Sequence, residues 1–347
     1  MGGGPDRPGL TSAPGSISAP GSISAPGSIT ARGSISAGAE RRPAIVVAGP
    51  TASGKSALAL AIAREFAGVV INADSMQVYR ELRILTARPG EAELALAPHR
   101  LYGVLPASER CSAGRWRQMA EGAAMESGLL PIFVGGTGLY LRALTRGLSE
   151  IPAVPAGVAA EGSARLAERG ASGLHAELAR LDPVMAGRLA PGDSQRIYRA
   201  WTVRQATGRS LAEWQAAPPT GGWPSLTFVL TPPREALYAA CDARLHRMVE
   251  QGAVEEVRSL LALGLDPSLP AMRAVGVREL GEVIAGRQDL PSAVAASQQA
   301  TRRYAKRQMT WIRHQMPEAR IIEAQFSERI LPEIFNIIRH FLLTAPV

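Results

Sequence analysis

The chain has 347 residues, of which 46% are hydrophobic, and its formal net charge is +8. This length allows one large domain or two with a full hydrophobic core, and the basic balance favours a polyanionic partner. The two cysteines, Cys111 and Cys241, lack the spacing of metal ligands, and no apolar run is long enough to span a membrane. We therefore expect a cytoplasmic protein in a reducing compartment, without a zinc module or a membrane partner.

The first 42 residues form a low-complexity segment. The hexapeptide Ser-Ala-Pro-Gly-Ser-Ile begins at Ser12, recurs at Ser18 and Ser24, and has a degenerate copy from Thr30. One isoleucine per repeat does not offset the entropy lost when the chain is ordered, so we predict a disordered tail over residues 1–42. The segment lacks the apolar core of a secretory signal. A β-solenoid is the alternative, and the recurring proline and low apolar content disfavour it.

A phosphate-binding loop follows the first apolar run, residues 44–48, and precedes a helical pattern over residues 57–65. Its pattern is Gly, four residues, Gly-Lys-Ser, in which backbone N–H groups and the helix N-terminus converge on an anion. Lys55 would reach phosphoryl oxygens, and the hydroxyl of Ser56 is placed to hold Mg²⁺. Lysine occurs only here and at Lys306, which agrees with a need for a compact point charge. The predicted diphosphate or triphosphate site is Gly49, Pro50, Thr51, Ala52, Ser53, Gly54, Lys55 and Ser56.

A second apolar run, residues 68–72, predicts a buried parallel strand with Asp74 just beyond its carboxyl end. Ligands of open α/β sheets bind at the carboxyl ends of strands, so Asp74 and Lys55 should share one crevice. A carboxylate there is suited to accept a proton or to hold a metal through water. The alternative role is a helix N-cap, which is common for Asp after a strand.

Residues 129–134 predict a third buried strand, which ends in a second glycine-rich loop over residues 135–140. Helices are expected over residues 91–96 and 112–125, and loops over residues 86–89 and 98–102. Nucleotide hydrolases with a phosphate loop place an Asp at the end of such a strand to organise Mg²⁺ and water. Here Gly-Gly-Thr stands in that place, which favours transfer to an acceptor over hydrolysis.

The character of the chain changes over residues 147–222, where helical patterns replace strands. Candidate helices are residues 163–169, 173–181 and 194–206, and we interpret the region as a helical insertion. Arg196 and Arg199 are three residues apart and share a helix face. Taken alone, that pair is most simply a solvated basic face. A strand over residues 226–230 then resumes the sheet.

The C-terminal part reads as a helix over residues 234–263, a short apolar turn over 272–280 and a second helix over 298–316. On the second helix a narrow apolar stripe is flanked by Arg302, Lys306 and Arg313, with Arg303, Arg307 and His314 on the arc beyond. Tyr304 and Trp311 share another face. A cationic arc beside aromatic side chains suits a phosphate backbone with splayed bases, whereas solvated helices usually mix charge signs.

In order along the chain, these motifs resemble bacterial tRNA dimethylallyltransferases, the isopentenyltransferases that modify adenosine 37 beside the anticodon. The resemblance extends over residues 43–317. It rests on Gly49 to Ser56, Asp74-Ser75, Thr86-Ala87-Arg88-Pro89, Gly135 to Tyr140, Asp193 to Arg199, Gly276 within Val275 to Leu280, and Thr301 to Gln308. Two departures are Leu85, where the family usually has Gly before the Thr, and Arg100, where it commonly has a second His.

The resemblance implies an α/β fold: a P-loop NTPase-like parallel sheet core, an all-helical insertion domain and a helical C-terminal part. The implied domains are residues 43–146 and 223–347 for the core and C-terminal helices, and 147–222 for an insertion that grips the tRNA anticodon arm. The donor would be dimethylallyl diphosphate rather than ATP, with Mg²⁺ as cofactor. We expect a monomer.

The resemblance also implies residue roles. Asp74 would be the general base on the adenine amine, with Thr137 and Arg196 positioning the reacting groups, and Ser56 would be the metal ligand. Contacts to tRNA would come from Asp74, Ser75, Met76, Gln77, Gln195, Arg196, Ile197, Tyr198, Arg199, Arg273, Arg278, Lys306, Arg307, Gln308 and Arg313.

Two other classes of protein remain as alternatives. A small-metabolite kinase with this core would use ATP in the loop and Asp74 as base for a hydroxyl, but it has no need of the cationic helix. A non-catalytic RNA-binding protein would have no need of intact Lys55, Ser56 and Asp74.

Overall fold

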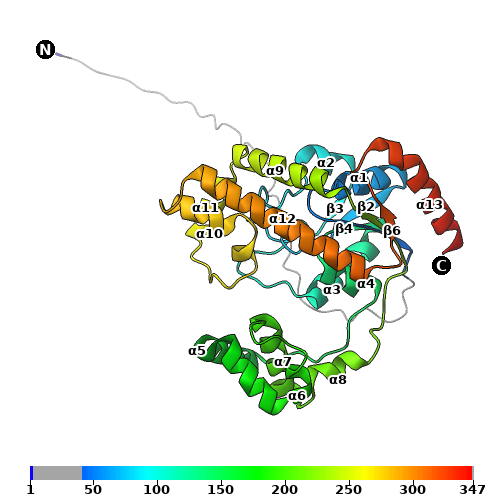
Figure 1. Ribbon diagram of the computed structural model, residues 1–347. Coiled ribbons are helices and arrows are strands. Elements are labelled where there is room, and N and C mark those ends of the chain that lie inside the picture. The colour runs from blue at the N-terminus through cyan, green and yellow to red at the C-terminus, as the bar shows by residue number, and fades with distance from the viewer. Residues whose placement is uncertain (3–40, 346–347) are drawn as a thin grey trace. The chain divides into compact units, whose positions relative to one another are not determined.

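The computed structural model of the chain describes residues 1–2 and 41–345 (Figure 1). The predicted tail thus lies outside the described residues, except at its ends. The chain divides into Met1–Ala39 and Glu40–Val347, and the second unit is described here. Arg41 and Arg42, at the end of the predicted tail, contact the folded unit. Their guanidinium groups donate to the carbonyl oxygens of Gly221 at 2.5 Å and of Gly128 at 2.6 Å.

A six-stranded parallel sheet forms the core, in the order β3-β2-β4-β1-β5-β6. Its strands are β1 (Ala44–Ala48), β2 (Gly68–Asn72), β3 (His99–Arg100), β4 (Leu130–Gly135), β5 (Ser225–Leu230) and β6 (Arg320–Ile322). Every residue of β1 is fully buried, and its side chains alternate between the two faces of the sheet. The predicted parallel α/β core is confirmed.

Helices cover both faces of this sheet (Figure 1). One face is packed by Leu58 and Ile62 of α1 and by Ile338 of α13, and the other by Trp116 of α3 and Ile312 of α12. These helices are α1 (Lys55–Glu65), α2 (Glu91–Leu96), α3 (Ala113–Ser127), α4 (Gly138–Thr145), α9 (Arg234–Glu250), α10 (Ala253–Ala262), α11 (Val277–Ile284), α12 (Leu290–Gln315) and α13 (Leu331–Thr344). Because β2, β4 and β1 are neighbouring parallel strands, their carboxyl ends lie side by side at one end of the sheet.

Between α4 and β5 the chain forms helices only. They are α5 (Ala156–Leu181), α6 (Pro183–Ala186), α7 (Ser194–Thr207) and α8 (Leu211–Ala216). Gly170 interrupts α5 with a φ of +67°, which accounts for the two shorter helices predicted there. Leu174, Leu178 and Trp201 centre a hydrophobic cluster built from this segment alone. The domain boundaries and the binding of an anticodon arm stay predictions.

Several predicted elements were wrong in extent. The helix predicted over residues 234–263 is two helices, because Gly252 adopts a φ of +99° between α9 and α10. The predicted turn over residues 272–280 overlaps the 3₁₀ turn η1 (Ala271–Arg273) and the first turn of α11. Helix α12 begins earlier than predicted, since the carboxylate of Asp289 accepts the backbone N–H of Ser292 at 2.8 Å and caps it.

Several short elements escaped prediction or were assigned to loops. The predicted loop 98–102 contains the edge strand β3, and α4 begins inside the second glycine-rich loop. The edge strand β6 and the 3₁₀ turn η2 (Glu328–Ile330) had no counterpart in the prediction. Strands of two or three residues carry too little periodicity to be distinguished from loops. In residues 1–2 and 41–345, no helix is long and apolar enough to cross a membrane.

Candidate active site

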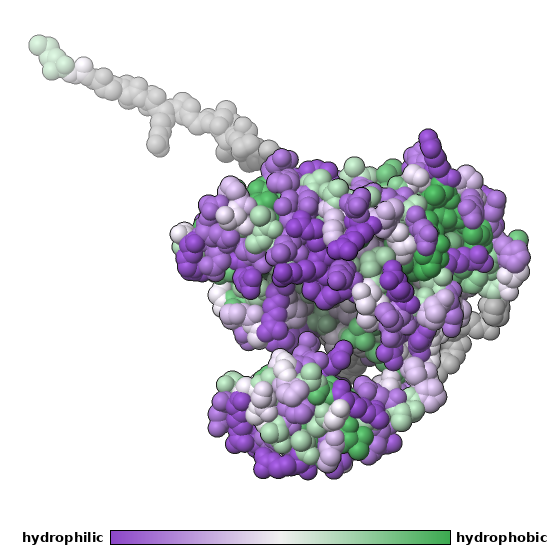
Figure 2. Space-filling view, viewed as in Figure 1, coloured by the Kyte–Doolittle hydropathy of each residue, from purple (hydrophilic) through white to green (hydrophobic). Residues whose placement is uncertain are grey.

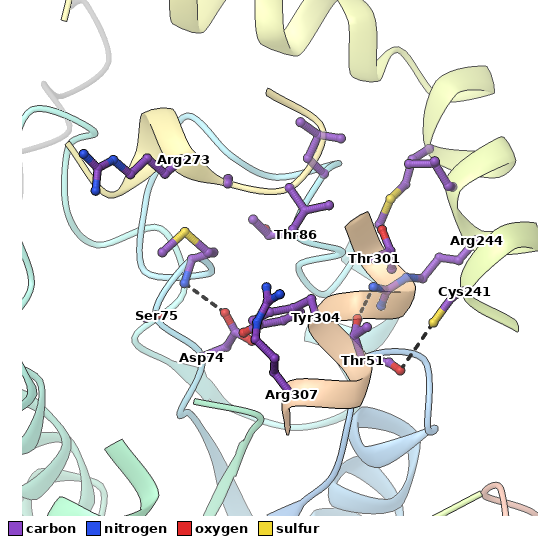
Figure 3. Close-up of a pocket in the computed structure, with 16 residues that line it drawn as sticks. Thr51, Asp74, Ser75, Thr86, Cys241, Arg244, Arg273, Thr301, Tyr304 and Arg307 are labelled. Atoms are coloured by element: carbon purple, nitrogen blue, oxygen red, sulfur yellow. Dashed lines mark hydrogen bonds between the residues drawn. The ribbon is translucent and has the colours of Figure 1, made fainter. Parts of the chain in front are cut away.

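Two adjoining pockets lie at the carboxyl edge of the sheet and share Thr51, Asp74, Thr86, Arg244 and Met248. We call the first the phosphate-loop pocket, because its other lining residues include Gly54, Lys55, Ser56, Arg83, Arg88 and Arg247. We call the second the aromatic pocket, which Figure 3 shows in close-up. Its other lining residues include Ser75, Leu85, Arg273, Val275, Tyr304 and Arg307.

The phosphate loop has the geometry expected of an anion cradle. Gly54 adopts a φ of +88° directly before α1, and Ala52 adopts a φ of +64° although it has a Cβ. The Lys55 ammonium donates to the Pro50 carbonyl oxygen at 3.2 Å and so curls back over the loop. Burial lowers the pKa of Lys55 to about 8, opposed by the Asp74 carboxylate and reinforced by Arg244. A bound anion would compensate this cationic charge.

Arg244 of α9 is a site residue that the sequence analysis missed. Its guanidinium donates to the hydroxyl of Thr51, and burial lowers its pKa, with Asp74 opposing this effect. It lines both pockets and contacts the phosphate loop through Thr51. The available signal was its place beside Leu245 and Met248, which mark the buried face of that helix.

Asp74 is held by a buried neighbour, Asn72, which is fully buried at the end of β2. The Asn72 amide accepts the backbone N–H of Asp74 at 2.8 Å and donates to the Asp74 carbonyl oxygen at 3.0 Å. The same amide donates to the carbonyl oxygen of Leu101, whose φ of +66° is unusual for a branched side chain. The carboxylate Oδ1 of Asp74 accepts the Met76 backbone N–H at 2.9 Å. Asp74 is thus rigidly placed where the two pockets meet.

Thr137 supports this segment from the second glycine-rich loop. Its hydroxyl accepts the backbone N–H of Ser75 at 2.9 Å and donates to the Ser75 hydroxyl at 3.2 Å. Thr137 lines neither pocket. The structure therefore brings Thr137 to the Asp74 segment, while its predicted catalytic role stays a prediction.

Gln308, which was predicted to contact tRNA, has a buried side chain, and that contact stays a prediction. Its carbonyl oxygen accepts the backbone N–H of Thr51 at 2.9 Å, and its amide nitrogen donates to the Gly136 carbonyl oxygen at 3.0 Å. The side chain thus joins the two glycine-rich loops. The ring of Trp311, an aromatic residue of the same helix, α12, packs against Gly138 and is partly buried, and its predicted place beside splayed bases stays a prediction.

Tyr304 is the aromatic side chain of α12 that enters the pocket, where Figure 3 shows it beside Asp74 and Arg307. The Arg307 guanidinium lies 5.7 Å from the Tyr304 ring centroid, a cation–π distance. Burial raises the pKa of Tyr304, and the nearby Asp74 carboxylate adds to this. Arg302 was predicted to be part of a cationic arc, but its charge is offset because the Asp242 carboxylate pairs with its guanidinium at 2.7 Å.

The remaining predicted tRNA contacts are spread over several elements. Met76 packs against the core, and the Gln77 amide donates to the carbonyl oxygen of Thr86 at 2.8 Å. Arg273 lines the aromatic pocket, while Lys306 and Arg313 line a third pocket between α9 and α12. Arg278 is exposed. Helices α9 and α12 face the viewer in Figure 2, where the surface over them is largely hydrophilic.

On α7 the predicted contacts divide by burial. Gln195, Arg196 and Arg199 are exposed, and Tyr198 is half-buried with its hydroxyl donating to the Ala159 carbonyl oxygen at 3.0 Å. Ile197 is fully buried in the cluster of the insertion, and its predicted contact with tRNA stays a prediction. No residue of α5 to α8 lines either site pocket, so the structure does not bring Arg196 to Asp74. Arg100 is likewise outside both pockets, whereas Leu85 lines the aromatic one.

Comparison with known proteins shows the family to which the chain belongs. Residues 77–315 match the sequence profile of the family described as IPP transferase, and residues 43–104 match that of isopentenyl transferase. The tRNA dimethylallyltransferase of Paramagnetospirillum magneticum is 56% identical over 311 residues, which cover 88% of this chain and 98% of that protein. The chain belongs to the tRNA dimethylallyltransferase family. This confirms the family predicted from its motifs and, with it, the prediction of an enzyme.

Other tRNA dimethylallyltransferases agree with this assignment. The protein of Rhodospirillum centenum is 58% identical over 286 residues, 80% of this chain and 91% of that one. Among solved structures, the tRNA isopentenylpyrophosphate transferase of Bacillus halodurans is 30% identical, with a TM-score of 0.63 over 87% of this chain and 97% of that one. A eukaryotic dimethylallyltransferase acting on tRNA is 25% identical, with a TM-score of 0.78 over 88% and 81% of the two chains.

Proposed function

We propose that this tRNA dimethylallyltransferase moves the dimethylallyl group of dimethylallyl diphosphate to the N6 amine of adenosine 37 in tRNA. The product would be N6-(dimethylallyl)adenosine. The observation that carries the proposal is the position of Asp74, which lines both the cationic phosphate-loop pocket and the aromatic pocket. A donor in the first pocket and a base in the second would meet at this carboxylate.

The phosphate-loop pocket suits the diphosphate of the donor. Lys55, Arg83, Arg88, Arg244 and Arg247 all line it, and the N-terminus of α1 adds a partial positive charge. Such groups stabilise the negative charge that develops on a leaving diphosphate.

Mg²⁺ fits this pocket as a cofactor bound largely through the substrate. The hydroxyl of Ser56 is exposed in the first turn of α1, in the same pocket as Asp74. In residues 1–2 and 41–345, no group of three or more His, Cys, Asp or Glu side chains could hold a metal ion. Ser56 would therefore share the ion with diphosphate oxygens and water, a donor set that Mg²⁺ accepts. When bound, Mg²⁺ offsets the charge of the leaving group.

The transfer itself forms one bond and breaks one. The N6 nitrogen bonds to C1 of the dimethylallyl group, the C1–oxygen bond breaks, and the electron pair leaves with the diphosphate. The N6 proton passes to the Asp74 carboxylate, whose position Asn72 and Met76 hold. A base extruded from the RNA and enclosed beside Tyr304 would exclude water, which otherwise captures an allyl cation.

The experiment is to incubate the protein with dimethylallyl diphosphate, Mg²⁺ and unmodified tRNA in the absence of ATP. Digestion of the tRNA and mass spectrometry of its nucleosides should reveal N6-(dimethylallyl)adenosine. A parallel reaction with Asp74→Ala should yield none. ATP-dependent phosphorylation of a small metabolite, with no prenylated nucleoside, would overturn the proposal in favour of the kinase alternative.

A further inference from the structure

The loop that carries Thr86 is held by a single acidic side chain from α10. The backbone N–H groups of Arg83 and Ile84 both donate to Oε2 of Glu256 at 2.7 Å, and that of Leu85 donates to Oε1 at 2.9 Å. Three successive N–H groups that converge on one carboxylate form a backbone nest, and bonds to an ionised acceptor are among the strong ones. Glu256 is more than 170 residues from this loop along the chain.

The loop also needs external support, because it contains a strained residue. Ala87 adopts a φ of +53°, a conformation that residues with a Cβ adopt rarely. Strain of this kind persists only where the surroundings hold it in place. Gln77 supplies part of the support, since its amide donates to the carbonyl oxygens of Thr86 at 2.8 Å and Ala87 at 3.1 Å. Glu256 therefore binds the N–H side of the loop, and Gln77 binds its carbonyl side.

This loop forms a wall of the phosphate-loop pocket. Arg83, Ile84, Thr86, Ala87 and Arg88 all line that pocket, and Thr86 lines the aromatic pocket as well. Arg88 is also fixed locally, because its guanidinium donates to the carbonyl oxygens of Tyr79 at 3.3 Å and Arg80 at 3.2 Å. A displacement of the loop would move one wall of the donor site, while the phosphate loop on the opposite wall would keep its place.

We propose that Glu256 is a positioning residue for the allylic diphosphate: it clamps residues 83–85 so that the loop forms the wall of the donor pocket. The carboxylate touches no reacting atom and acts through Thr86 and its neighbours. This inference rests on the proposed function for the identity of the donor, but the clamp itself is defined by the hydrogen bonds alone.

The test compares Glu256→Ala and Glu256→Gln with Glu255→Ala. Glu255 is an exposed acid in the same first turn of α10, so its removal has the same effect on charge and on the helix dipole. The glutamine keeps one acceptor oxygen but presents an N–H₂ to a backbone N–H. We expect Glu256→Ala to raise the KM for dimethylallyl diphosphate about tenfold, because the hydrogen bonds from the loop to the charged carboxylate are lost. The KM of Glu256→Gln should lie between those of wild type and Glu256→Ala. Glu255→Ala should match wild type, and the KM for tRNA should stay within about twofold.

Two further measurements do not depend on catalysis. Hydrogen exchange of residues 83–85 should accelerate in Glu256→Ala and not in Glu255→Ala. The affinity for inorganic diphosphate with Mg²⁺, measured by calorimetry, should fall by the same factor as the donor KM rises. If wild type binds diphosphate but transfers no prenyl group, the proposed function fails while the clamp is still judged by this affinity. Unchanged donor KM and diphosphate affinity in both Glu256 variants, or an equal rise in the KM for tRNA, would overturn the inference.

Discussion

Two glycine-rich loops follow the neighbouring strands β1 and β4 at the same end of the sheet. The glycines of the two loops have different structural roles. In the first, Gly49 and Gly54 have φ values of +157° and +88°, and the loop lines a cationic pocket. In the second, the glycines have ordinary φ values, and a Cβ would collide with the Ala73 backbone at Gly135, the Gln308 amide at Gly136 and the Trp311 ring at Gly138.

The difference shows that glycine serves two physical purposes at equivalent places in one sheet. In the first loop it permits a left-handed backbone, and at Gly54 it also permits close approach of Phe326. In the second it permits close approach, because α12 packs directly against the loop. Gln308 connects the two, since it bonds to Thr51 of one loop and Gly136 of the other. The second loop therefore supports the first and the Asp74 segment between them.

The largest effect should come from the carboxylate between the loops. Asp74→Asn keeps an oxygen for the Met76 N–H but removes the base, so we expect the single-turnover transfer rate to fall about a thousandfold. Binding of tRNA in a filter assay should be unchanged. If tRNA affinity collapsed while bound substrate still reacted at the normal rate, Asp74 would not be the base.

Removal of the cation from the first loop should be the next largest effect. We expect Lys55→Ala to lower kcat/KM for dimethylallyl diphosphate about a hundredfold, because one donor to the developing negative charge is lost. Thermal unfolding should be little changed, since the hydrogen bond that the Lys55 ammonium makes within residues 41–345 goes to the Pro50 carbonyl of its own loop. A loss of stability with normal kinetics would mean that this lysine serves the fold.

A methyl group in the second loop tests close packing directly. Gly136→Ala would press on the Gln308 amide and on the Gly49 carbonyl oxygen, so we expect a loss of about 1–3 kcal/mol in the free energy of unfolding by urea. Gly122→Ala, in the middle of α3 with nothing within 4 Å, is the control and should stabilise by up to about 1 kcal/mol. Equal stability of both variants would refute the close-approach role of this loop.

Substitution of Lys306, the other lysine of the chain, should separate effects on tRNA binding from effects on donor binding. It is exposed on α12, two residues before the buried Gln308. We expect Lys306→Ala to weaken tRNA binding a few-fold and to reduce the slope of log affinity against log salt by about 1, as for one lost phosphate contact. The KM for dimethylallyl diphosphate should not change, in contrast to Lys55→Ala. An unchanged salt slope would remove Lys306 from the tRNA surface.

The smallest effect should follow deletion of residues 1–40, which retains Arg41 and Arg42 with their bonds to Gly221 and Gly128. Transfer rate and tRNA affinity should stay within about threefold, because the composition of this low-complexity repeat predicts no packed structure. A deletion that also removes Arg41 and Arg42 is the comparison and should lower the unfolding temperature. A large loss of turnover from the shorter deletion would assign the tail a role in catalysis.

The sequence by itself determined the parallel α/β core, the phosphate loop, the place of Asp74 at a strand end and the family. Each of these depends on residues that lie close together along the chain: an apolar run, a turn and the first residues of the next element. Hydrophobic periodicity indicates which residues of a segment are buried, and glycine spacing indicates the backbone conformation of a loop. Both signals can be read from a short stretch of sequence. The boundary between α9 and α10 had such a signal in Gly252, which the prediction overlooked, whereas the short edge strands had none.

Only the tertiary structure decided which side chains complete the site. Gln308 bonds to Thr51 across 257 residues, and Arg244 bonds to the same threonine across 193. Glu256 reaches its loop across a similar span, and Asp242 neutralises Arg302. On a helix wheel these residues look like any polar positions, because periodicity shows which face is buried but not which element packs against it. Residues this far apart along the chain come into contact only when the helices pack on the sheet.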